Sequence, residues 1–110
     1  MNKLQDAFRQ FSKERDWDQF HTPENLAKSI SIEAGELLEC FQWSTTEFDM
    51  QDVTEELADV LSYCIQMCNA LDLDPEKIVL DKLEKTKKKY PIDKAKGKST
   101  KYTKLQNAQS

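Results

Sequence analysis

The sequence predicts an all-α protein, and its sparse use of turn residues is the first reason. The chain of 110 residues contains only two glycines and three prolines, with long segments between them. Sandwiches and barrels of strands need turn residues far more often. Within the long segments, apolar residues recur every three or four positions, which is the spacing of amphipathic helices. The length suits one domain, so we expect a bundle of helices.

The first two helices are expected over residues 2–17 and 23–42. In the first, these apolar residues recur at helical spacing: Leu4, Ala7, Phe8 and Phe11. A connector, DWDQFH, follows. The second helix has a clear start, because Thr22 supplies a capping hydroxyl, Pro23 suits the first helical position and Glu24 suits the helix dipole.

The third helix is expected over residues 48–71, with Thr46 as its N-cap. Its second half, VLSYCIQMCNAL, carries no charge. Such a segment is typical of the centre of a bundle or of a subunit interface. Asp74-Pro75-Glu76 repeats the cap-and-proline start, so a fourth helix is expected from there to about Lys89. We expect a helical domain over residues 1–92, and a basic tail over residues 93–110 that is ordered only if docked.

Charge is distributed unevenly along the chain. Residues 1–74 hold five Lys and Arg against sixteen Asp and Glu, whereas residues 75–110 hold eleven against four, which sums to the totals of 16 and 20. This asymmetry fits a nucleic-acid-binding arm, or an acidic metal site that shares a pocket with a basic anion site. The charged N-terminus lacks a continuous apolar run, so we expect no export signal, and no segment approaches the roughly 20 apolar residues of a membrane span. With three cysteines, an odd number, the chain is expected in the cytoplasm.

Two pairs of acidic residues are the main candidates for a functional site. Glu33 and Glu36 form one pair and Glu56 and Asp59 the other, each spaced three positions apart. On a helix this spacing puts the Cβ atoms roughly 5–6 Å apart on one face. Both pairs border apolar stripes, and antiparallel packing of the two helices would bring them together. A single pair is usually a solvated helix surface, but two such pairs predict a site for a divalent cation.

The residue types favour a hard cation. The only histidine has no Glu-x-x-His spacing, and two of the cysteines lie inside the apolar run, which disfavours di-iron and zinc sites. Oxygen ligands suit Mg²⁺ first and Mn²⁺ second. Because Mg²⁺ commonly binds proteins through a few carboxylates together with substrate phosphates, a phosphorylated ligand is expected.

These acids and their surroundings resemble the MazG-like, all-α nucleoside triphosphate pyrophosphohydrolases, and in particular their dCTP pyrophosphatase branch. The similar segments are ERDWDQFHTPENL, GELLECFQW, EELADVLSY, KKKYP and GKSTKYTKL. The resemblance implies Mg²⁺-dependent cleavage of a nucleoside triphosphate, with dCTP or a related dNTP as substrate, to the monophosphate and pyrophosphate. It also implies that Glu33, Glu36, Glu56 and Asp59 are the metal ligands, and that the protein assembles as a homodimer or homotetramer.

The same resemblance implies a set of substrate contacts. Trp17 and Trp43 match positions that enclose the base or sugar, and Tyr63 lies one turn beyond Asp59 on the same face. Lys82 and Tyr90 match positions that contact the substrate, and we expect these contacts at its phosphates. Lys85 is added because, like Lys82, it lies before the run Lys87–Lys89, which is more typical of a solvated helix end.

Three positions depart from the family pattern. Ile32 stands where many relatives carry a glutamate, and Phe8 and Thr86 stand where relatives commonly carry His and Asn. Base preference is therefore left open.

In the implied mechanism, Glu33 or Glu36 is the general base that deprotonates a water, and lysines balance the charge of the leaving pyrophosphate. The alternative is a non-enzymatic helical interaction module, with surface acids and a basic tail that binds an acidic partner or nucleic acid. Apart from Tyr90 and Tyr102, no aromatic residues are interleaved with the lysines, which argues against nucleic acid.

Overall fold

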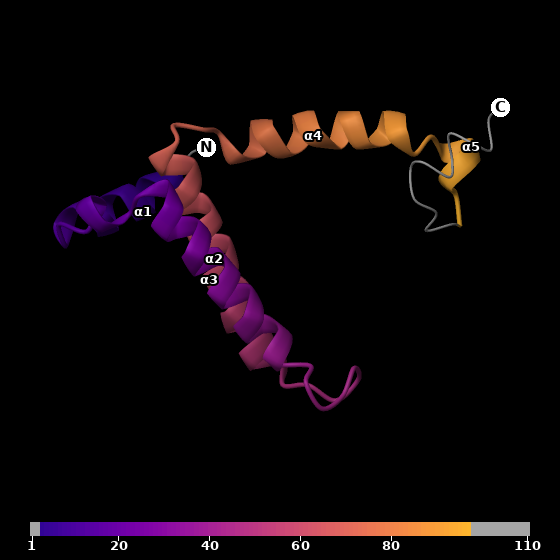
Figure 1. Ribbon diagram of the computed structural model, residues 1–110, viewed down its shortest axis with the longest axis horizontal. Coiled ribbons are helices and arrows are strands. Elements are labelled where there is room, and N and C mark those ends of the chain that lie inside the picture. The colour runs from indigo at the N-terminus through magenta and orange to yellow at the C-terminus, as the bar shows by residue number, and fades with distance from the viewer. Residues whose placement is uncertain (1–2, 98–110) are drawn as a thin grey trace. The chain divides into compact units, whose positions relative to one another are not determined.

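The computed structural model describes residues 3–97, and every regular element in this range is helical (Figure 1). This confirms the all-α prediction. In order, the elements are α1 (Lys3–Glu14), the short 3₁₀ helix η1 (Asp18–Phe20), α2 (Pro23–Glu39), α3 (Met50–Ala70), α4 (Pro75–Lys89) and α5 (Ile92–Ala95). The four long helices lie where the sequence predicts them, and η1 and α5 are additional.

Two helix ends differ from the sequence-based prediction, and each has a local cause. α1 stops at Glu14 instead of residue 17, because Asp16 adopts a positive φ of 54° and turns the chain away from the helix axis. α2 stops at Glu39 instead of residue 42, because the next N–H groups bond three positions back in a tighter turn, as in the 3.2 Å bond from Cys40 to the Leu37 carbonyl.

The two capping predictions have opposite outcomes. Thr22 caps α2 as predicted, since its hydroxyl accepts a 3.2 Å hydrogen bond from the N–H of Asn25. The prediction that Thr46 caps α3 is wrong. Asp49 takes this position, and its carboxylate accepts hydrogen bonds from the first N–H groups of α3, at 2.8 Å from Gln51. Thr46 lies in a turn before the helix, in which its own N–H donates to Ser44 Oγ.

The chain divides into two compact units, Met1–Pro75 and Glu76–Ser110. The predicted boundary at residue 92 stays a prediction, because most of the basic tail, residues 98–110, lies outside the described residues. In the second unit, α4 carries ion pairs along its surface, such as the 2.8 Å contact between Lys77 and Asp81. Among the described residues, no helix has both the length and the apolar character that crossing a membrane requires.

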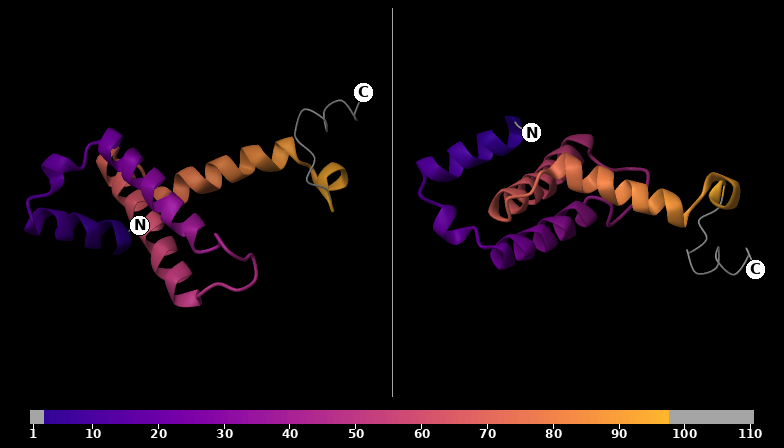
Figure 2. Two further views of the ribbon diagram at one scale, coloured as in Figure 1. Left: turned by 60° about the horizontal axis from the view of Figure 1, so that its bottom comes forward. Right: turned by 90° about the horizontal axis from the view of Figure 1, so that it is seen from above.

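In the first unit, α2 and α3 form an antiparallel hairpin, and α1 packs against α3 (Figure 2). Leu26 of α2 is 1% exposed, and Cys68 of α3 is buried as well. α1 is tied to the end of α3 by a buried polar contact, in which the Gln5 amide donates to Asn69 Oδ1 at 3.0 Å and to the Leu73 carbonyl at 2.9 Å. The hairpin is the element that brings the two acidic pairs together.

Candidate metal centre

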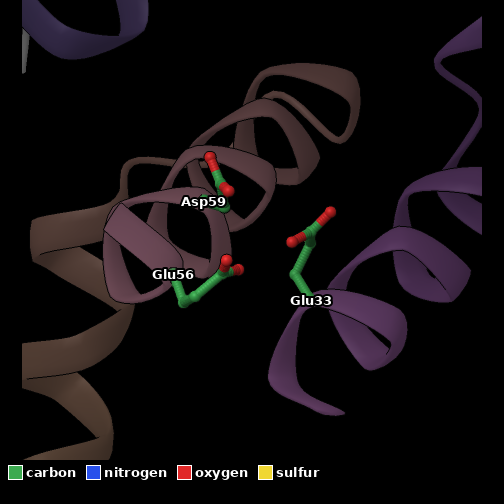
Figure 3. A group of neighbouring side chains, drawn as sticks. All are labelled: Glu33, Glu56 and Asp59. Atoms are coloured by element: carbon green, nitrogen blue, oxygen red, sulfur yellow. The ribbon is translucent and has the colours of Figure 1, made fainter. Parts of the chain in front are cut away.

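Three carboxylates from two helices meet on the α2–α3 hairpin (Figure 3). Glu33 projects from α2, and Glu56 and Asp59 project from α3; one oxygen of each lies within 4.8 Å of the other two. The sequence produces this arrangement locally, because Glu33 follows the buried Leu26 by two helical turns and so lies on the side of α2 that faces α3. Glu56 and Asp59 share a face of α3 because they are three positions apart.

Burial and mutual repulsion shape the electrostatics of this cluster. The pKa of Glu33 is raised above its usual value, first by burial and then by the neighbouring Glu36, Asp59 and Glu56. Burial also raises the pKa of Glu56, again with a contribution from Glu36. Each carboxyl is therefore harder to ionise than in water, since its neighbours carry the same charge.

Glu36 lies beside the cluster and not inside it. It contributes to the raised pKa values of Glu33 and Glu56, but its side chain is exposed. The structure thus gathers all four acids that the sequence singles out, with three in a tight group and the fourth on the solvent side.

The oxygen atoms of the cluster fit a divalent cation. Glu33 Oε2 and Glu56 Oε2 are both buried, and neither has a hydrogen-bond partner among the described residues. A buried carboxylate oxygen without a donor is costly, and a cation would satisfy both atoms at once. The group contains only carboxylates, which is the ligand set of hard cations such as Mg²⁺ or Mn²⁺.

Cys40 is a neighbour of this site that is not among the residues predicted from the sequence. Its thiol lies 3.7 Å from the carbonyl oxygen of Glu36, and its pKa is raised by burial and by the charges of Glu56 and Asp52. The spacing of four residues from Glu36 was the available signal, because it places Cys40 on the same face of the helix end.

The two tryptophans have contrasting environments. Trp17 lies in the turn after α1, where its ring packs edge-on against Phe11 at 5.4 Å and against His21 at 6.4 Å between centroids. Trp43 lies in the loop between α2 and α3 and is 90% exposed. Tyr63 is half-buried on α3, one turn beyond Asp59. The structure does not gather these three rings into one enclosed site within the first unit.

The basic candidates belong to the second compact unit. Lys82 and Lys85 lie on α4, and Tyr90 directly follows its last residue. All three side chains are exposed. Their predicted role in phosphate binding stays a prediction.

The chain is similar to known proteins in both sequence and structure. A sequence model of the MazG-like family matches residues 28–105. dCTP pyrophosphatase 1 from Mus musculus is 38% identical over 105 residues, and that from Homo sapiens is 37% identical; each alignment covers 87% of this chain and 62% of the relative. The chain therefore spans less than two-thirds of the length of these relatives. The crystal structure of a pyrophosphatase from Archaeoglobus fulgidus superposes with a TM-score of 0.73 at 42% identity, covering 78% of this chain and 87% of that one.

Proposed function

The chain belongs to the MazG-like family, and on this premise we propose that it is a Mg²⁺-dependent nucleoside triphosphate pyrophosphohydrolase. Its proposed substrate is dCTP or a related dNTP, and its products are the nucleoside monophosphate and pyrophosphate. The proteins similar to it are named dCTP pyrophosphatase 1 and pyrophosphatase, which supports both the reaction and the substrate class.

The observation that carries this proposal is the carboxylate cluster. Three acids from two helices share one site, and two of their oxygens are buried without a hydrogen-bond partner in the described part of the chain. In a merely structural hairpin, these positions would be more stable as apolar residues, since burial and repulsion both oppose ionisation. A site that binds a cation and a polyphosphate gives the four acids a function.

When bound, Mg²⁺ supplies a Lewis acid that polarises phosphate oxygens and lowers the pKa of water. Glu33, Glu56 and Asp59 would hold the cation from the two sides of the hairpin. Glu36 is the better placed of the two candidate bases, because it lies beside the tight group and is exposed to solvent. Its carboxylate would orient a water for in-line attack on phosphorus and accept its proton.

The remaining substrate contacts are proposed from the family resemblance and from their placement on the chain. Trp17, Trp43 and Tyr63 would contact the base or sugar. Lys82 and Lys85 of α4 would neutralise the departing pyrophosphate, and the Tyr90 hydroxyl would donate a hydrogen bond to a phosphate oxygen. All are accessible or half-buried in the described structure, as substrate-binding groups must be.

Self-association into a homodimer or homotetramer is part of the proposal. In the first unit only Leu26 and Cys68 are buried apolar residues among those described, whereas Leu38 of α2 is 72% exposed and Leu61 of α3 is 55% exposed. Two buried apolar side chains contribute little to the stability of a helical hairpin. A second copy of the chain would cover the exposed leucines of α2 and α3. We also place the protein in the cytoplasm, where its free cysteines would stay reduced.

A nucleotide panel with detection of pyrophosphate tests the function directly. The full chain is incubated with each of the common dNTPs and NTPs in Mg²⁺, and again in EDTA. We expect dCMP and pyrophosphate in equal amounts from dCTP, with no turnover in EDTA. Release of orthophosphate instead, or no hydrolysis of any nucleotide, would overturn the proposal. The interaction-module alternative further predicts that Mg²⁺ and EDTA leave the melting temperature unchanged.

A further inference from the structure

A cavity of about 400 Å³ lies within the first unit, outside the carboxylate cluster. α1 and α3 form two of its walls, and the turn around η1 and the start of α2 contribute Asp18, His21 and Pro23 to its lining. The residues that α1 and α3 contribute are Phe8, Arg9, Ser12, Gln66, Asn69 and Ala70. Its volume is that of small-molecule sites, and its lining combines an aromatic ring with several polar side chains.

The cavity lies along α3 from the carboxylates, on the same helix face. At about 100° per residue, Gln66 lies only about 20° around the axis from Asp59, and Tyr63 lies about 40° from Asp59 on the other side. Gln66 is seven positions after Asp59, which corresponds to about 10 Å along the helix. A nucleotide whose phosphates are held at the cluster would therefore direct its sugar and base toward this cavity.

Two carboxamides line the cavity, and they differ in what they can offer a ligand. Asn69 is engaged at both ends, since its Oδ1 accepts from Gln5 at 3.0 Å and its Nδ2 donates to the Gln5 carbonyl at 3.1 Å. Gln66 makes one such bond, in which Nε2 donates to the Ser62 carbonyl at 3.2 Å. Because only the amino end of a carboxamide can donate to a carbonyl, this bond fixes the orientation of Gln66.

The orientation leaves Gln66 Oε1 without a donor in residues 3–97, and Gln66 is a cavity-lining residue. An acceptor oxygen pairs with the exocyclic amino group of cytosine, N4–H₂, and not with thymine, which presents the acceptor O4 at the same position. The ring of Phe8 offers an apolar surface against which a base can pack.

We propose that Gln66 is a specificity-determining residue, with the cavity receiving the base of the nucleotide and Gln66 Oε1 accepting a hydrogen bond from the cytosine amino group. This inference rests on the proposed function and adds to it the residue that distinguishes dCTP from dTTP. Asn69 has a different role, because its bonds to Gln5 hold α1 in place as the opposite wall.

The test compares kcat/KM for dCTP and dTTP in the full chain and in three variants. Gln66→Met keeps the length of the side chain and removes the acceptor, whereas Gln66→Glu keeps an acceptor. Gln51→Met is the matched control, because Gln51 is an exposed glutamine on the same helix and is not among the residues lining the cavity. Loss of one neutral hydrogen bond should lower the dCTP to dTTP ratio roughly 2- to 12-fold in Gln66→Met.

Each result has a defined reading. A lower ratio in Gln66→Met, with the ratio kept in Gln66→Glu and Gln51→Met, supports the inference. An unchanged ratio in Gln66→Met, or an equal fall in Gln51→Met, overturns it and leaves the proposed function intact. If the wild-type chain hydrolyses no nucleotide, the proposed function fails and the inference fails with it. Should Gln66→Met not fold in a thermal melt, loss of the preference in Gln66→Glu would overturn the inference.

Discussion

Removing one carboxylate from the tight cluster is the most direct perturbation of the candidate site. Glu56→Ala leaves Glu33 and Asp59, two of the three residues whose oxygens lie within 4.8 Å of one another. Changes to groups that merely support metal ligands typically cost 10- to 100-fold in metal affinity or activity, so loss of a ligand should lower kcat/KM by more than about 100-fold. The helical fold should survive, because burial and the neighbouring carboxyls raise the pKa of Glu56, so the substitution removes a group whose charge is unfavourable in the fold.

Glu55→Ala is the matched control for this experiment. Glu55 is the adjacent residue of α3, but it is exposed and near Gln51, with 3.4 Å between the two side chains. Both variants remove one negative charge from the same helix turn, so any general electrostatic effect is shared. Activity of Glu55→Ala should stay within about twofold of the wild type, as for other surface substitutions away from a site.

Pyrophosphate release and circular dichroism are measured for both variants, with melting curves in Mg²⁺ and in EDTA. Mg²⁺ well above its Kd should raise the melting temperature of the wild type and Glu55→Ala by more than about 5 °C, with a much smaller effect on Glu56→Ala. A folded Glu56→Ala chain with wild-type activity and an undiminished Mg²⁺ shift would refute the metal site. Equal losses in both variants would show that bulk charge, and not coordination, is responsible.

Three further outcomes are expected. Leu26→Ala should lower the free energy of unfolding in urea by about 2–5 kcal/mol, because the Leu26 side chain of α2 is 1% exposed. A change below about 1 kcal/mol would contradict this burial. In EDTA, the melting temperature should fall as pH rises from the ordinary glutamate pKa of 4.5 through the raised pKa values of Glu33 and Glu56. In this range the folded state binds more protons than the unfolded state, so raising the pH destabilises the fold. A rise in melting temperature over this range would contradict the raised pKa values. Lys82→Ala should raise KM for the triphosphate, whereas Lys87→Ala, whose lysine is paired with a neighbouring glutamate at 3.1 Å, should not; equal effects would remove the special role of Lys82.

Features of the fold that depend on neighbouring residues could be predicted from the sequence. The start of α2 is one such feature, because Thr22 and Pro23 define a cap within a few residues. The start of α3 could not be chosen in this way, since Thr46 and Asp49 are both good caps. The hydroxyl of Ser44 decides between them, because it accepts hydrogen bonds from the N–H groups of Thr46 and Glu47 and holds that segment in a turn.

The candidate site follows the same division. The helix faces of the acids could be predicted from residue spacing: Glu33 relative to Leu26, and Glu56 relative to Asp59. Antiparallel packing of the two helices then brings these faces together. The position of Glu36 beside the cluster depends on the register between α2 and α3, which no local pattern encodes. The cavity near Gln66 could not be predicted either, because it is formed by segments far apart in the sequence.

Because the acids lie on both arms of a helical hairpin, a bound cation would also restrict the unfolded chain. A cation shared by Glu33 and Glu56 would join two points separated by the whole loop between α2 and α3, and would therefore act as a reversible cross-link. Such a link lowers the entropy of the unfolded chain by closing a loop, as a disulfide does, but it can be removed by chelation. Occupancy of the site would then set how firmly the two arms stay together, and the hairpin would be most rigid when it is ready for chemistry.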